Sequence, residues 1–156
     1  MSGAATFIAW ENRLGKMVRE PGGVRLAEGL EQAGKNLDSI QMECLRAMDG
    51  QIEDMERLCA EGGRQPPDET KHEIYDLAND VLAVAGSFRL SELGEAAFCL
   101  CELVDRLRTT GKWSQPAVEV HLSAFRLLRH PDPGVDRSSV ILGLRGLIER
   151  AAVIAE

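Results

Sequence analysis

Apolar residues recur at steps of three and four positions along most of the chain, the spacing that places them on one face of an α-helix. The longest such row predicts a helix from about residue 26 to a stop at Gly62-Gly63. Its members are Leu26, Leu30, Ala33, Leu37, Ile40, Cys44, Met48, Ile52, Met55 and Cys59. Each glycine inside this row weakens the helix by about 1 kcal/mol relative to alanine, so the pattern leaves room for a bend or break near Asp38 or Gly50.

Shorter rows of the same kind predict one helix before this one, over about Thr6–Val18, and four after it. The residues expected to separate these helices are Pro21-Gly22-Gly23, Pro66-Pro67-Asp68, Leu90-Ser91, Gly111, Ser114-Gln115-Pro116 and Pro131-Asp132-Pro133-Gly134. The apolar faces expected for the last four helices are Ile74, Leu77, Val81, Ala85 and Phe88; Leu93, Ala97, Leu100, Val104 and Leu107; Val118, Leu122, Phe125 and Leu128; and Val140, Leu144, Leu147, Ala151 and Ile154. No stretch carries a strand pattern, and short joins favour antiparallel neighbours.

These rows predict an all-α protein built as an antiparallel four-helix bundle with an additional N-terminal helix and a C-terminal helix. Residues 1–22 would form a capping helix and its break, and residues 23–156 the bundle, within one domain overall. The length of 156 residues fits one domain. Only 4% of the residues are aromatic while 44% are hydrophobic, so aliphatic side chains suited to helices must fill the core.

The formal net charge of −7, with no basic block, argues against nucleic acid and anionic membrane surfaces as partners. The first residues show no signal-peptide pattern, and no stretch approaches the roughly 20 apolar residues of a membrane span. We therefore expect a soluble, cytoplasmic protein.

The cysteines and histidines predict neither a metal site nor a catalytic pair. Four cysteines form no C-x-x-C and no zinc spacing, and they are interpreted as reduced, structural thiols. His121 lies beside an apolar row and is expected to be half-buried and hydrogen-bonded, and His130 sits at a helix end. Phosphate-loop, nucleophile-elbow and dinucleotide motifs are missing from the sequence. We expect no enzymatic activity, cofactor or metal.

The helix expected after Pro67 carries unusually small side chains on its outer face. With Leu77 taken as the core direction, the opposite side holds His72, Asp76, Asn79, Ala83 and Gly86. Two small residues beside a polar one would let another backbone come close. The plain alternative is that alanine is simply the best helix former and that Gly86 eases a crossing or bend.

The segment from Ile74 to Phe88 resembles the phosphoacceptor helix of bacterial histidine phosphotransfer (HPt) domains, most closely the stand-alone alphaproteobacterial type. Ala78, Asp80, Val81 and Phe88 fall on matching positions. The further pieces that resemble this family, in the same order, are Asn12-Arg13-Leu14, the Pro-Gly-Gly break, the long second helix and residues 118–126. The resemblance implies an HPt-type bundle that docks a receiver domain or a histidine kinase.

The departures from the family pattern fall on the residues that carry its chemistry. Asn79 stands where the phosphoacceptor histidine would be, Leu82 replaces the lysine that helps stabilise the phosphate, and Ala83 replaces the glycine that gives the receiver room. An amide nitrogen is not nucleophilic, because its lone pair is delocalised into the carbonyl. The resemblance therefore implies a non-catalytic pseudo-HPt that binds its partner without phosphotransfer, with Ser91 and Glu95 on the next helix as the rim of the docking surface.

Two alternatives stay open. His72, seven residues before Asn79 and on the same face, could be a displaced phosphoacceptor in an active phosphotransfer protein. The chain could instead be a structural or dimerisation bundle unrelated to phosphorelay, in which the long second helix forms a homodimer seam because its apolar row outlasts a compact bundle.

Overall fold

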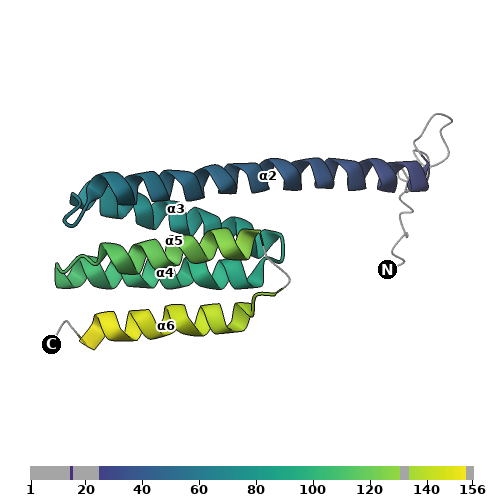
Figure 1. Cartoon of the computed structure of the whole chain (residues 1–156). Coiled ribbons are helices and arrows are strands. Elements are labelled where there is room, and N and C mark those ends of the chain that lie inside the picture. The colour runs from purple at the N-terminus through teal and green to yellow at the C-terminus, as the bar shows by residue number, and fades with distance from the viewer. Residues whose placement is uncertain (1–14, 16–24, 131–133, 154–156) are drawn as a thin grey trace, which may run out of the picture. The chain divides into compact units, whose positions relative to one another are not determined.

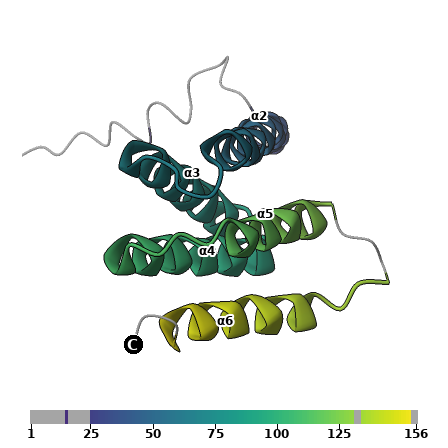
Figure 2. The ribbon, with the colours of Figure 1, turned by 60° about the vertical axis from the view of Figure 1, so that its left-hand side comes forward.

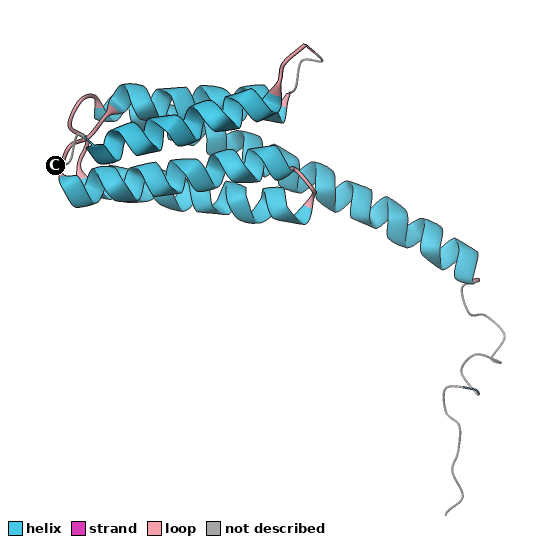
Figure 3. Cartoon of the chain, turned by 90° about the horizontal axis from the view of Figure 1, so that it is seen from below, coloured by secondary structure: helices cyan, strands magenta, loops and turns pink. Residues whose placement is uncertain are grey.

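The computed structural model describes Gly15, residues 25–130 and residues 134–153, the last three without their side chains. Within these ranges the chain forms five helices and no strand (Figures 1 and 3). They are α2 (Leu26–Gly62), α3 (Asp68–Ser87), α4 (Ser91–Thr110), α5 (Gln115–Arg129) and α6 (Arg137–Val153). The all-α prediction is confirmed for this part of the chain, while the predicted helix over Thr6–Val18, apart from Gly15, and the division at residue 22 lie outside it.

The predicted helix ends match the local chemistry of the chain. Pro67 precedes α3, where its missing N–H costs nothing. Gly111 caps α4 in the left-handed conformation with φ of 68°, which a residue without a Cβ adopts without strain. Pro116 occupies the first turn of α5, as expected. By contrast, α2 runs through Asp38 and Gly50 without a break.

The chain divides into two compact units, residues 1–39 and 40–156. The described part of the first unit is Gly15, Arg25 and the beginning of α2 up to Ser39. The second unit contains the remainder of α2 together with α3, α4, α5 and α6. Its successive helices alternate in direction, and α6 lies against α4 and α5 (Figures 1 and 2).

In the second unit, α4 is the central helix, because α3, α5 and α6 all pack against it. Half of its twenty residues are buried. The part of α2 that belongs to this unit is joined to α5 by two ion pairs, Glu56 with Arg126 and Asp49 with Arg129. These contacts make the second unit a helical bundle around one core.

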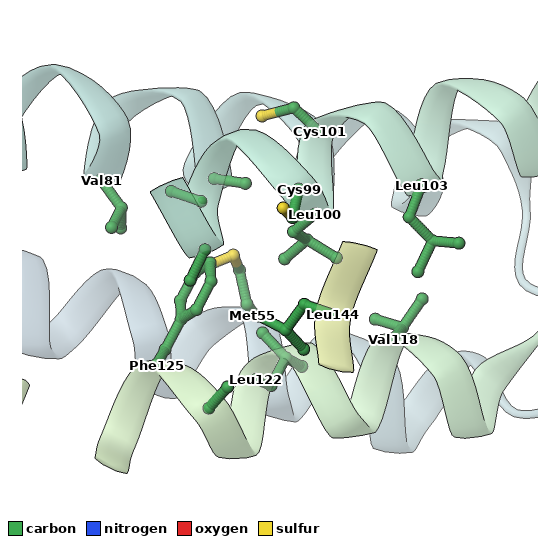
Figure 4. Close-up of a cluster of buried hydrophobic side chains, with 14 of the residues drawn as sticks. Met55, Val81, Cys99, Leu100, Cys101, Leu103, Val118, Leu122, Phe125 and Leu144 are labelled. Atoms are coloured by element: carbon green, nitrogen blue, oxygen red, sulfur yellow. The ribbon is translucent and has the colours of Figure 1, made fainter. Parts of the chain in front are cut away.

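The core is filled by aliphatic and sulfur-containing side chains with one central phenylalanine, Phe125, which is fully buried (Figure 4). Figure 4 labels its other members Met55, Val81, Cys99, Leu100, Cys101, Leu103, Val118, Leu122 and Leu144. On α6 the buried side chains are Ile141, Leu144 and Ile148. The predicted Val140 and Leu147 are only half-buried, because they line a groove between α6 and α5.

The inward face of α3 also differs from the prediction. The fully buried residues are Ile74, Ala78, Val81 and Ala85, whereas Leu77 and Phe88 are half-buried. The reason is the close approach of α4: a Cβ placed on Gly94 would lie 3.5 Å from the Cβ of Ala85. Small residues therefore face α4, and the middle of the buried face of α3 lies nearer to Ala78 than to Leu77.

Candidate docking surface on α3 and α4

The five residues predicted for the outer face of α3 are all exposed. They are His72, Asp76, Asn79, Ala83 and Gly86. A Cβ placed on Gly86 would meet no atom within 4 Å, so the described residues leave open space above it. The Asn79 amide points away from the core made by Ala78 and Val81, and no helix of the described chain crosses this face.

Three contacts fix the register of α3 against α4. Gly94 lies opposite Ala85, and the Cys101 thiol donates to the carbonyl oxygen of Tyr75 at 3.9 Å. Further along, Nη1 of Arg108 lies 3.4 Å from Nδ1 of His72. Because residue numbers rise on one helix as they fall on the other, the pair is antiparallel, and the middle of the 94–101 stretch is level with the middle of the 75–85 stretch.

This register places Phe98 of α4 level with Asn79 of α3. Phe98 is 56% exposed, and among the described residues it is the one aromatic side chain in the group of exposed large apolar residues. Tyr75 and Leu82 lie half-buried along the edge of α3 that faces α4. We group Asn79, Gly86, Tyr75, Leu82 and Phe98 as a candidate docking surface across two helices, called the docking surface below.

Sequence reasoning missed Phe98. The expected apolar row of its helix was Leu93, Ala97, Leu100, Val104 and Leu107. A phenylalanine directly after Ala97 lies about 100° away from it around the helix. That offset, for the bulkiest residue of the helix, was the available signal.

Ser91 and Glu95, predicted as the rim, have different surroundings. Ser91 is exposed, and its hydroxyl donates to Oε2 of Glu92 at 2.8 Å. Ser91 precedes Phe98 by seven residues, so both lie on the same face of α4. Glu95 is half-buried and ion-paired with Arg145 of α6. Ser91 therefore lies on the Phe98 side of α4, whereas Glu95 faces α6.

His72 stands at one end of the same face with charged neighbours at both ring nitrogens. Its Nε2 lies 3.6 Å from Oδ2 of Asp76, and the guanidinium of Arg108 faces Nδ1 at 3.4 Å. All three side chains are exposed. The end of the docking surface beyond Tyr75 is therefore polar and carries both signs of charge.

One histidine and three cysteines are buried among the core side chains. His121 is fully buried, more deeply than predicted, and its Nδ1 donates to the Ala117 carbonyl at 2.7 Å. Burial lowers the pKa of His121, which favours the neutral ring. Burial also raises the pKa of the Cys59 and Cys101 thiols to about 11, so neither is a reactive thiolate at neutral pH. The four cysteines are free, as predicted, and the described residues include no cluster of His, Cys, Asp and Glu that could hold a metal ion.

Two apolar hollows lie away from the docking surface. One, of about 470 Å³, is formed where α4, α5 and α6 meet near Trp113, and the other, of about 450 Å³, runs between α5 and α6 beside Leu127. Their linings contain no carboxylate, thiol or imidazole. None of the residues predicted for partner docking contributes to either hollow.

No family model matches this chain, and neither the curated proteins nor the solved structures contain a match to it. None of the helices within the described ranges combines the length and the apolar character that crossing a membrane requires. The resemblance of residues 74–88 to an HPt phosphoacceptor helix accordingly stays a prediction.

Proposed function

We propose that this protein is a non-catalytic pseudo-HPt that binds a receiver domain of a two-component system through the docking surface and modulates signalling by occupying it. The observation that carries the proposal is the exposed Phe98 of α4, level with the exposed Asn79 of α3. The alternative partner is a sensor kinase of such a system, which would bind the same face.

The side chains of this face support binding without group transfer. Asn79 offers an amide where a nucleophilic imidazole would be needed, and Leu82 and Ala83 follow it where the family has a cation and a glycine. An amide can donate and accept hydrogen bonds but cannot carry a phosphoryl group as a phosphohistidine does. Docking, in contrast, depends on apolar contact and on charge at the rim, both of which are present here.

Phe98 has the character of an interface anchor. Aromatic side chains near the centre of an interface carry a large share of the binding energy when a partner covers them. The open space over Gly86 and the short side chain of Ala83 would allow a partner helix to approach α3 closely. Exposed Asp76 and Asp105 lie near the apolar centre and favour a partner with basic residues at its rim.

The test is a titration of the labelled protein with candidate receiver domains from the same organism, followed by amide chemical shifts. We expect shifts centred on residues 75–86 and 94–101, and a dissociation constant that rises at least tenfold in Phe98→Ala or Gly86→Arg. The matched control is Leu142→Ala on α6, because Leu142 is 66% exposed and lies outside the docking surface. Shifts spread evenly over the chain, or an equal loss in the control, would contradict the proposal.

A second measurement separates binding from phosphotransfer. Incubation with a phosphorylated receiver should leave no acid-labile phosphate on this chain, in wild type and in His72→Ala alike. Phosphate that appears in wild type and disappears in His72→Ala would replace the proposed function with phosphotransfer by His72.

A further inference from the structure

The first part of α2 carries a row of apolar side chains that the described residues leave uncovered. Leu26 is 79% exposed, Leu30 65%, Leu37 66% and Ile40 53%. Further along the same helix, Met48, Ile52 and Met55 are 0%, 3% and 0% exposed, because they enter the core of the bundle. An apolar helix face that stays in water gives up the packing from which most helical stability in proteins derives.

The spacing of this row is that of a coiled coil. Successive members are four, three, four, three and four residues apart: Leu26, Leu30, Ala33, Leu37, Ile40 and Cys44. This alternation averages 3.5 residues, so the row stays on the side of a partner helix instead of drifting around the axis. In heptad terms Leu30 and Leu37 take position a, and Leu26 and Ile40 take position d. The shape that fits this surface is therefore another helix.

Most positions on either side of the row are uncharged. They are Ala27, Gly29, Gly34, Asn36 and Gln41, followed by the charged Glu43 at the end of the row. Other charged residues lie on the far side, where Lys35 and Glu31 form an ion pair of 2.7 Å with both side chains about two-thirds exposed. These flanking positions normally decide by charge which helices pair. Between Leu26 and Gln41 the flanks are neutral, so two identical chains meet no like charges along this stretch even though each chain carries a net charge of −7.

We infer that a second copy of this chain covers the row, so that the α2 helices of two molecules pair as a short coiled coil. From Leu26 to Cys44 the row spans 19 residues, about 27 Å at a rise of 1.5 Å from each residue to the next. The α2 helix of a second copy has the same length and covers every member. The helix expected from the sequence over Thr6–Val18 is about 20 Å long, too short to cover both ends. None of these residues belongs to the docking surface, so the inference is independent of the proposed function.

The test is sedimentation equilibrium of the full chain at tens of micromolar. We expect twice the chain mass of 17.1 kDa for the wild type and a single chain mass for the double variant Leu30→Glu/Leu37→Glu. The matched control is Gln32→Glu/Ser39→Glu, which adds the same charge to exposed positions of the same helix outside the row and should remain dimeric. The thermal unfolding transition of the bundle should persist in both variants, because Leu30 and Leu37 are about two-thirds exposed.

Two results would overturn the inference. One is a wild-type chain that sediments as a monomer, which is also the outcome if the chain's own residues 6–18 cover the row. The other is dimerisation that weakens equally in the two double variants, because the charge added and not the apolar row would then be responsible.

Discussion

Arg129 of α5 and Asp49 of α2 form an ion pair at the side of the bundle, with Nε of the guanidinium 2.8 Å from Oδ1 of the carboxylate. A second contact runs parallel to it, because Nη2 donates to Oδ2 at 3.1 Å. The side chains are only 17% and 35% exposed, so water screens this pair less than the other ion pairs of α2. The contact joins helices far apart in the sequence and fixes α2 against α5.

Asp49→Ala should therefore lower the free energy of unfolding by about 1–3 kcal/mol, because it leaves a largely covered guanidinium without its acceptor. Urea denaturation followed by circular dichroism measures the change. Glu31→Ala is the control: it removes an ion pair from the same helix whose side chains are 67% and 66% exposed, and we expect a change within about 0.5 kcal/mol. Equal losses in both variants would show that the Asp49 pair contributes no more than a surface pair.

His121 makes stability depend on pH. Burial holds its pKa in the folded chain below the ordinary value, which is about 6.5. The unfolded chain therefore binds the proton first, so the contribution of the neutral ring is fully present above about pH 6.5 and is lost as the pH falls. The thermal midpoint should drop between pH 7.5 and pH 5 in the wild type and drop less in His121→Leu.

The control for this effect is His130→Gln, because His130 is exposed, and this variant should follow the wild-type profile. The hydrogen-bonded carboxyl of Asp136, whose pKa is lowered chiefly by the Ser139 hydroxyl, acts at lower pH, near the ordinary carboxyl range of about 4. An unchanged slope in His121→Leu between pH 7.5 and pH 5 would remove His121 as the cause.

The buried thiols should be unreactive in the folded protein. Cys59, Cys99 and Cys101 are buried, and burial raises the pKa of all three. Cys44 is only half-buried. With a disulfide reagent at pH 8, three thiols per chain should titrate only after unfolding in urea. Four thiols that react at one rate in the native protein would contradict this arrangement.

Two glycines should respond oppositely to the same substitution. Gly86 has helical φ and open space, so Gly86→Ala should raise the free energy of unfolding by about 0.4–1 kcal/mol. Gly111 has φ of 68°, so Gly111→Ala should lower that free energy by about 1 kcal/mol or more. Chemical denaturation of both variants measures the difference in sign. A gain in both would show that the Gly111 backbone is not held in the left-handed region.

Local signals were enough to predict most helix boundaries. Pro67, Gly111 and Pro116 act through their own backbone conformations, which do not depend on distant parts of the chain. The face of α3 that is buried could not be predicted from such local signals. Ala85 is buried where Gly94 lets α4 come close, and no periodicity within α3 contains that information.

In the candidate site, too, some positions could be predicted from spacing along one helix and others depend on how the helices pack. The exposure of Asn79 and Gly86 followed from the spacing along one helix, whereas the position of Phe98 beside them depends on the register of α4 against α3. Glu95 was expected at the rim, yet it pairs with Arg145 because α6 packs on that side of α4. Spacing along the long α2 row predicted a helix but could not tell which part of it the chain's own core would cover.

The central position of α4 has a consequence for synthesis of the protein. Its buried residues meet α5 and α6 as well as α3, and both of those partners are encoded after Gly111. A chain synthesised only as far as Gly111 therefore lacks two of the three helices that pack against α4. Until Ile148 has followed, the side chains of α4 that α5 and α6 cover in the folded bundle have no partner.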